Sequence, residues 1–233
     1  MKIKKAMILA AGYGKRMLPI TEKIPKPLIK IGDKNLLENT INLLKKNGVD
    51  EIIINTHYLG ELIDSFLRDK KNFGIKIFTK HENEILNTGG GIFNATTSFE
   101  NEPFLVINPD TIWNEKHLKE FKELENLYFK TEKASLLLVD KKLSYDKSFR
   151  GDFNIEDNSV IKREKENQFI FTGVQIIKRD IFKNINEKIF SMNKIWDKLI
   201  LEKNIVALKS KEQFFHINNI DIYKEILLKK NLK

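Results

Sequence analysis

Residues 7–17 read MILAAGYGKRM, and this stretch joins a short apolar run to a glycine-rich, basic loop. A continuous apolar run that ends near glycine is typical of a buried parallel strand. Gly12 and Gly14 would let the backbone approach a ligand closely and turn N–H groups toward phosphates. Lys15 and Arg16 add positive charge where a polyphosphate would lie. We therefore expect a first strand whose loop binds phosphates, although a glycine pair alone would more often form an ordinary turn with two surface cations.

The loop differs from the two commonest phosphate-binding motifs. A Walker A loop needs the pattern G-x-x-x-x-G-K-[ST], which this sequence lacks. The dinucleotide-binding fingerprint needs a third glycine where Met17 stands. It also needs an acidic residue that closes the second strand, where residues 55–57 are Asn, Thr and His. Residues 7–17 thus indicate a phosphate site of another kind.

Apolar runs and helical periodicity alternate on the carboxyl side of this loop. The pattern predicts strands at 51–55, 75–78, 104–107 and 134–139, and helices at 36–47, 59–67, 91–97 and 118–128. After Asp140 it changes to short strands at 152–155, 159–162 and 169–177, followed by helices near 180–185, 195–202 and 221–231. Repeated strand–helix units imply a mostly parallel sheet wrapped by helices. Because no Pro-, Gly- or Ser-rich linker separates the halves, we expect one domain over 1–233.

The composition excludes several classes of protein. The net charge is 41 − 32 = +9, but only five of the basic residues are Arg, whereas base readout and phosphate forks favour Arg. We therefore expect no nucleic-acid partner. With no cysteine, the chain cannot form disulfides, thiolate zinc sites, iron–sulfur clusters or a thiol nucleophile. Its apolar runs are far shorter than the roughly 20 residues of a membrane span. The N-terminus does not read as a signal peptide, so we expect a cytoplasmic protein without a membrane partner.

A second motif lies shortly after the loop, at residues 25–28, which read PKPL. Two prolines fix the backbone on either side of Lys26, so this lysine sits in a stiff, extended segment. Such a mount suits an ammonium group that must be placed on a phosphate. Alone, the motif would more often be a rigid surface turn; its short distance from the basic loop favours the phosphate interpretation.

Two further stretches follow predicted strands. Residues 87–93, NTGGGIF, place three glycines at the start of a helix, which suits a close backbone approach to a nucleobase or phosphate. Residues 108–110, NPD, follow the strand at 104–107, and ligands of open α/β sheets bind outside the carboxyl ends of strands. A lone carboxylate such as Asp110 is a suitable Mg²⁺ ligand, because Mg²⁺ keeps phosphates and water as its other ligands. A helix cap is an equally good interpretation of Asp110 alone.

Together these stretches resemble a known enzyme family. Residues 9–21, LAAGYGKRMLPIT, and 25–28, PKPL, resemble the signature of the sugar-1-phosphate nucleotidyltransferases. Within that family, four stretches resemble the N-acetylmuramate-1-phosphate uridylyltransferases: TGGGI at 88–92, GDF at 151–153, FTGVQ at 171–175 and FSMNKIWD at 190–197. The resemblance extends over essentially the whole chain.

The resemblance implies a fold and a reaction. The fold would be α/β, Rossmann-like and three-layered, with a mostly parallel sheet of the glycosyltransferase-A-like kind. Residues 1–140 would bind the nucleotide, and the lobe formed by 141–233 would bind the sugar. The sugar phosphate would attack the α-phosphorus of a nucleoside triphosphate and release pyrophosphate, with positioning and positive charge as the main sources of catalysis. The favoured substrates are UTP and N-acetylmuramate 1-phosphate, which would place the enzyme in peptidoglycan recycling.

The resemblance also assigns residues to roles. Those that would carry catalysis are Arg16, Lys26 and Asp110. Those that would bind the nucleotide are Ala11, Gly12, Gly14, Lys15, Arg16, Lys26, Glu82, Gly89 and Asn108. Those that would line the sugar pocket are Asp152, Glu164, Thr172, Gly173 and Asn193. Asp110 would hold Mg²⁺, with Mn²⁺ as a possible replacement.

One stretch departs from the family pattern. Residues 214–221 read FFHINNID, so His216 stands where the family has a second metal-binding Asp, and Asn218-Asn219 replace Gly-Thr. Mg²⁺ prefers oxygen ligands. His216 could contact a phosphate, take part in binding a softer ion such as Mn²⁺, or simply pack, leaving the metal to Asp110.

Alternatives to the favoured substrates stay open at this point. The enzyme could use another sugar phosphate or dTTP, as in a glucose-1-phosphate uridylyl- or thymidylyltransferase. The departure at His216 also leaves open a non-catalytic regulator that binds nucleotide sugars. The sequence is compatible with a monomer or a small homo-oligomer.

Overall fold

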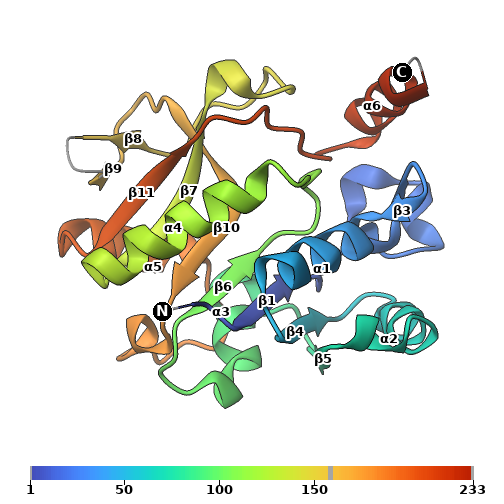
Figure 1. Cartoon of the computed structure of the whole chain (residues 1–233), viewed down its shortest axis with the longest axis horizontal. Helices are drawn as coiled ribbons and strands as arrows, with labels where there is room; N and C mark the ends of the chain where they lie inside the picture. Colours follow the sequence, from blue (N-terminus) through green and yellow to red (C-terminus); the bar gives the residue numbers. More distant parts are fainter. Residues whose placement is uncertain (1, 157–159, 232–233) are drawn as a thin grey trace.

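A mixed sheet organises the chain, and its strand order brings the first strand near the centre (Figure 1). The computed structural model describes residues 2–156 and 160–231. In that part of the chain the main sheet has seven strands in the order β11-β7-β10-β6-β1-β4-β5. Their bounds are Lys5–Leu9 (β1), Glu51–Thr56 (β4), Lys76–His81 (β5), Phe104–Ile107 (β6), Ala134–Asp140 (β7), Phe169–Ile177 (β10) and Ile205–Ser210 (β11). Only β10 runs antiparallel to its neighbours in this sheet, so the predicted mostly parallel sheet is confirmed.

Helices cover both faces of the sheet and make three layers. On one face lie α1 (Leu36–Asn47), α2 (Gly60–Asp69) and α4 (His117–Thr131). On the other lie α3 (Asn87–Ala95) and α5 (Met192–Leu201). The two-residue period of a strand explains the division, since Ala6 and Ile8 of β1 join the first core and Met7 the second. Figure 1 shows α1 and α4 crossing in front of the strands.

The local signals that predicted α1 are present as expected. The side chain of Asn35 caps its start by accepting a hydrogen bond from the Glu38 N–H at 2.7 Å. Gly48 ends it in the left-handed conformation, with φ of 97°. The predicted bounds of β6 and β10 also agree with the structure.

Several sequence predictions were wrong about element bounds. The helix expected near 180–185 is only a 3₁₀ helix, Arg179–Phe182, because the chain turns at Asn184 with φ of 69°. Helix α3 begins at Asn87, before its glycines, and α5 begins at Met192 behind a Ser191 cap. The edge strand β11, which pairs in parallel with β7, was missed.

A small hairpin stands where short strands were expected after Asp140. It pairs β8 (Asn154–Ile155) with β9 (Ile161–Lys162). The prediction at 159–162 began at Ser159, which lies outside the described residues.

The last helix, α6 (Ile220–Asn231), packs against the segment that follows β1. Ile226 joins a core cluster with Met17, Ile29 and Leu36, beside the short hairpin of β2 (Lys30–Ile31) and β3 (Lys34–Asn35) (Figure 1). The end of the described chain is thereby held next to the glycine-rich loop. No helix among the described residues combines the length and apolar character needed to cross a bilayer.

Candidate active site

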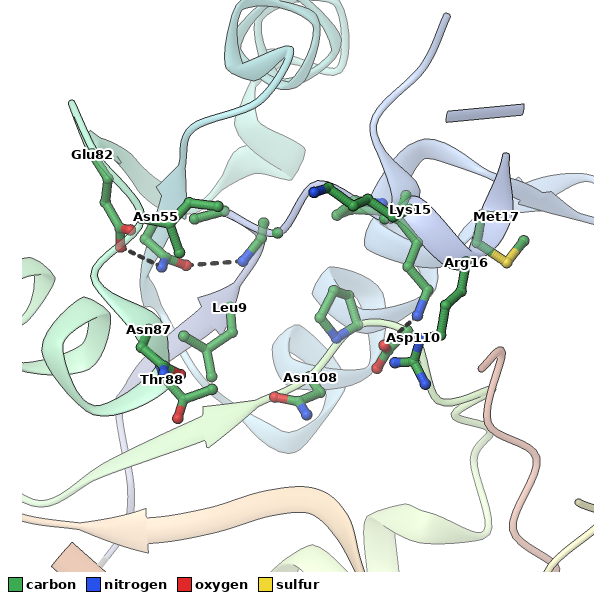
Figure 2. A pocket seen from close by; sticks show the side chains of 18 of the residues that line it. Leu9, Lys15, Arg16, Met17, Asn55, Glu82, Asn87, Thr88, Asn108 and Asp110 are labelled. Atoms are coloured by element: carbon green, nitrogen blue, oxygen red, sulfur yellow. Dashed lines mark hydrogen bonds and ion pairs between the residues drawn. The ribbon is translucent and has the colours of Figure 1, made fainter. Parts of the chain in front are cut away.

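A cavity of about 440 Å³ opens at the carboxyl ends of β1, β4 and β6. A volume of this size suits a small-molecule ligand. The residues that line it are Leu9, Ala10, Ala11, Gly12, Gly14, Lys15, Arg16, Met17, Lys26, Pro27, Asn55, Glu82, Ile85, Asn87, Thr88, Asn108, Pro109, Asp110 and Asn218. Figure 2 shows two sides: Lys15, Arg16 and Asp110 on one, and Glu82, Asn55 and Asn87 on the other.

Lys26 and Asp110 form an ion pair in the wall of this cavity. The Lys26 Nζ donates to Asp110 Oδ2 at 2.6 Å, and both side chains are mostly buried. Lys26 begins a 3₁₀ helix, Lys26–Leu28, directly after the extended Pro25, so the prediction of an extended backbone at Lys26 itself was wrong. Asp110 is the third residue after the end of β6. The structure therefore brings together the two stretches that the sequence singled out separately.

His216 lies beside the same carboxylate. Its Nδ1 is 3.5 Å from Asp110 Oδ1 and 3.4 Å from the Thr111 hydroxyl, while its ring stacks on Phe214. Burial lowers the pKa of His216 below its ordinary value of 6.5, against the opposing charge of Asp110. The imidazole is consequently neutral at neutral pH. His216 is thus both packed and adjacent to Asp110, which combines two of the alternatives considered from the sequence.

Asp110 is ionised. Burial alone would raise the pKa of Asp110, but the charges of His216 and Lys26 outweigh it and hold that pKa at about 2. Near pH 7 the His216 imidazole is neutral, so the positive charge that balances the Asp110 carboxylate there comes from Lys26.

The residues around Asp110 offer Mg²⁺ one carboxylate ligand. Asp110 Oδ1 is buried and has no hydrogen-bond partner among the described residues, so it can still accept a cation. In the same part of the chain, no group of three Asp, Glu or His side chains could enclose a metal. A single carboxylate suits Mg²⁺, which takes its remaining ligands from phosphates and water.

The glycine-rich loop presents its cations at the cavity. Gly14 has φ of 65°, and a Cβ atom there would lie 2.9 Å from the Thr21 methyl carbon, so any other residue would strain this turn. The Lys15 ammonium lies 5.3 Å from the centre of the Tyr13 ring. The Arg16 guanidinium donates to the side-chain oxygen of Asn218. Ala11, Gly12, Gly14, Lys15 and Arg16 all line the cavity, as expected.

Glu82 also reaches the cavity wall, but both of its carboxylate oxygens are occupied. Oε1 accepts from the Asn55 side chain at 2.7 Å, and Oε2 accepts from the Leu86 N–H at 3.0 Å. Asn55 in turn accepts from the Ala10 N–H at 2.8 Å. In this arrangement Glu82 holds the wall in shape, and Asn55 joins it to β1 (Figure 2).

The glycines of α3 serve close packing in this structure. The N–H groups of Gly89 and Gly90 both donate to the Phe190 carbonyl, at 2.9 and 3.0 Å. A Cβ atom at Gly89 would lie 2.5 Å from the Phe190 ring. Gly89 is therefore held against residue 190, while Asn87 and Thr88 face the cavity.

The residues expected to bind the sugar lie beyond the described cavity wall. Gly173 is the nearest: its carbonyl accepts from the Asn108 N–H at 2.9 Å, where β10 bulges with φ of 95°. Thr172 is buried, and its hydroxyl donates to the Leu137 carbonyl.

Asp152, Glu164 and Asn193 belong to a second group, near the start of α5. Asp152 accepts from the Phe171 N–H at 2.8 Å, and burial raises its pKa. Asn193 accepts from Arg163 at 2.5 Å, whereas Glu164 is exposed and pairs with Lys162. Met192, beside Asn193, donates its N–H to the Thr88 hydroxyl at 2.9 Å, so this group adjoins the cavity through Thr88.

Four polar residues that line the cavity were given no individual role from the sequence: Asn55, Asn87, Thr88 and Asn218. Asn55 could have been found, because it is the last residue of the strand predicted at 51–55, on the ligand side of the sheet. Asn87 could have been found because it opens the glycine-rich stretch at 87–93. Asn218 carried no such signal beyond its place in the departing stretch.

Comparison with known proteins gives consistent matches. Residues 5–145 match the family described as Nucleotidyl transferase. The chain is 34% identical to the N-acetylmuramate alpha-1-phosphate uridylyltransferase of Neisseria meningitidis, over 78% of each chain. It is 31% identical to the D-glycero-alpha-D-manno-heptose 1-phosphate guanylyltransferase of Campylobacter jejuni, over 94% of each chain. Among solved structures, HddC from Yersinia pseudotuberculosis aligns with a TM-score of 0.78 and 25% identity, covering 98% of this chain and 100% of that one.

Proposed function

We propose that the chain, which belongs to the sugar-1-phosphate nucleotidyltransferase family, joins UTP to N-acetylmuramate 1-phosphate and releases pyrophosphate. The product would be UDP-N-acetylmuramate, a form in which a recycled cell-wall sugar can be reused. The observation that carries this proposal is the Lys26–Asp110 pair, set 2.6 Å apart in a cavity that the basic glycine-rich loop also lines. The choice of substrates is supported by the names of two relatives, both N-acetylmuramate alpha-1-phosphate uridylyltransferases, whose matches cover 78% and 93% of this chain.

The reaction brings two anions together, so the chain must supply positive charge and alignment. A sugar phosphate is already ionised and needs no general base to attack the α-phosphorus. Lys15 and Arg16, on the loop, would hold the β- and γ-phosphates of the leaving pyrophosphate. Lys26 would lie between the α-phosphate and the attacking phosphate, where its charge offsets their repulsion.

Mg²⁺ would be held by Asp110 and would neutralise phosphate charge when bound. The Lys26 ammonium would keep this carboxylate ionised and in place. We assign His216 a supporting place behind Asp110, because its ring is packed on Phe214.

The two parts of the chain would divide substrate binding between them. Residues 1–140 would bind the nucleotide, with Asn55, Asn87 and Thr88 on the side of the cavity away from the cations (Figure 2). Residues 141–233 would bind the sugar through the β10 bulge and the group near the start of α5. Asn108 connects the two parts, because it lines the cavity and donates its N–H to the Gly173 carbonyl.

The direct test is pyrophosphate release with UTP, dTTP or GTP against four sugar phosphates. These are N-acetylmuramate 1-phosphate, N-acetylglucosamine 1-phosphate, glucose 1-phosphate and a manno-heptose 1-phosphate. We expect the highest kcat/KM for UTP with N-acetylmuramate 1-phosphate. A preference for GTP with the heptose would replace our substrate pair with that of the Campylobacter relative. No release with any pair would favour a non-catalytic binder.

A further inference from the structure

Arg16 is an exposed side chain on the glycine-rich loop, yet its guanidinium is held in one place. Its Nη1 donates to the side-chain oxygen of Asn218, a residue 202 positions away in the sequence. Both residues line the cavity. An unrestrained arginine on a loop would sample many rotamers, and ordering it on a ligand costs conformational entropy. A contact that already orders the guanidinium removes part of that cost.

Asn218 is itself fixed by the segment that carries it. The neighbouring Ile217 is fully buried and donates its N–H to the Asp110 carbonyl at 2.8 Å. The Asn218 N–H donates to the His216 carbonyl at 3.0 Å. The amide of Asn218 is thereby placed next to the Lys26–Asp110 pair from the far end of the chain.

The environment also fixes which way the Asn218 amide points. Its nitrogen lies 3.5 Å from Asp146 Oδ2, and its oxygen faces Arg16. The opposite orientation would place the amide N–H groups against the guanidinium and the oxygen against a carboxylate. The geometry therefore presents an acceptor to Arg16 that carries no net charge.

We propose that Asn218 is a positioning residue that holds the Arg16 guanidinium over the triphosphate part of the cavity without cancelling its charge. The inference rests on the proposed function for the role of Arg16. A neutral amide orders the guanidinium and leaves its full charge, and its remaining donors, for phosphate oxygens. A carboxylate at the same place would order it too, but would repel the triphosphate.

The adjacent Asn219 provides a matched control. Its side chain accepts from the Ile222 N–H at 2.9 Å, in the first turn of α6. The two asparagines thus contribute to different structures, one to the cavity and one to the helix. An effect that arises only from loosening the end of the chain would be shared by both.

The experiment measures kcat, KM for UTP and the midpoint of thermal unfolding in N218A, N218D, N219A, R16A and the double variant N218A/R16A. We expect N218A to lower kcat/KM for UTP by roughly tenfold with its unfolding midpoint unchanged. N218D should fall below N218A, because it adds negative charge beside the triphosphate. N219A should lower the unfolding midpoint and leave kcat/KM unchanged. In the R16A background, N218A should cause no further loss of kcat/KM for UTP, because Asn218 acts through Arg16.

Three results would overturn the proposal: wild-type kinetics in N218A, a tenfold loss that persists in the R16A background, or N218D at least as active as N218A. Calorimetric binding of UTP to the same variants gives a readout that needs no turnover. If the wild-type protein turned over no sugar phosphate, the proposed function would fail, while the order of UTP affinities would still decide the role of Asn218. Equal affinities in wild type and N218A would then reject it.

Discussion

Lys26 and Asp110 form a mostly buried ion pair, so a change to one alters the environment of the other. Removing Lys26 leaves the Asp110 carboxylate largely buried without its cation. We predict that K26M lowers the free energy of unfolding by about 1–3 kcal/mol and that D110N, added to K26M, restores part of that loss. The single variants K26M and D110N should each lose at least about 100-fold in kcat, because K26M lacks the ammonium and D110N the carboxylate that act on the reacting phosphates in the proposed reaction.

Urea unfolding of the wild type, both single variants and the double variant measures the coupling between the two residues. Additive losses of stability would show that the pair is independent in solution. That result would mean that Lys26 does not stabilise the ionised form of Asp110.

Gly12 and Gly14 give a second pair of variants at the residue scale. Apart from its two chain neighbours, no heavy atom of the described residues lies within 4 Å of a Cβ atom built at Gly12, which lines the cavity. At Gly14 the same atom would meet Thr21 in a backbone with φ of 65°. We predict that G12A folds with wild-type stability but binds UTP at least about tenfold more weakly, because its methyl group occupies ligand space. G14A should instead lose stability.

Thermal unfolding and UTP binding by calorimetry separate the two effects. Wild-type UTP affinity in G12A would mean that the nucleotide does not approach this part of the loop.

The residues found from the sequence share one property: each sits in a local pattern that implies its own geometry. Lys26 lies between two prolines and Asp110 follows a buried strand, so both could be placed before the fold was known. Asn218 could not, because its partner Arg16 is 202 positions away and the segment that carries it has no regular periodicity. Glu82 lines the cavity, and its two hydrogen bonds depend on Asn55 and Leu86, which no pattern linked to it.

At the scale of elements, α3 shows why a glycine run misled the prediction of its start. Glycine weakens an isolated helix, so the pattern favoured a loop before residue 91. In the fold, a Cβ atom at Gly90 would lie 2.3 Å from the Lys188 carbonyl oxygen, and one at Gly91 would lie 2.8 Å from Glu82 Oε1. Packing this close outweighs helix propensity, and only the tertiary structure reveals it.

Two helices on the same face offer a pH-dependent prediction. Glu125 of α4 accepts from the Asn47 side chain of α1 at 2.7 Å, and burial raises the pKa of Glu125 above its ordinary 4.5. The folded protein therefore binds this proton more tightly than the unfolded chain does. Its contribution to stability is fully present below pH 4.5 and is lost as pH rises through the raised pKa.

We predict that E125Q is more stable than the wild type at pH 7 and that the difference shrinks toward pH 4. The new amide could also donate to Asn47 Oδ1, which has no partner among the described residues, and such a bond contributes about 1 kcal/mol. Chemical denaturation at pH 4, 5.5 and 7 measures the trend. A difference that stays constant across this range would mean that Glu125 titrates normally.

At the scale of the whole molecule, the alternation of strands and helices was sufficient to predict a mostly parallel sheet wrapped by helices. The strand order was not predictable in the same way, because β10 enters between β6 and β7 in the opposite direction and β11 adds an edge. That insertion matters for the proposed function, since it joins residues 141–233, the proposed sugar-binding part, to β6, the strand that precedes Asn108 and Asp110. A division into 1–140 and 141–233 therefore describes two sets of residues around one continuous sheet.

Near its C-terminal end the chain comes back to the glycine-rich loop that follows β1. Ile217 bonds to the Asp110 carbonyl, Asn218 reaches the cavity beside Arg16, and α6 then packs over the segment after β1. This arrangement places residues from the stretch 9–17 and Asn218 at one site. It also explains why substitutions near residue 218 should affect a reaction centred on the first 110 residues.

The central claim is that a sugar phosphate attacks the α-phosphorus of a nucleoside triphosphate in this cavity. The most direct measurement follows radioactive phosphorus from UTP labelled at either the α- or the γ-position, with and without N-acetylmuramate 1-phosphate. We predict that the α-label enters the nucleotide sugar and the γ-label enters pyrophosphate, and that both transfers require the sugar phosphate. Release of the α-label as UMP, or of the γ-label as inorganic phosphate without added pyrophosphatase, would contradict the claim.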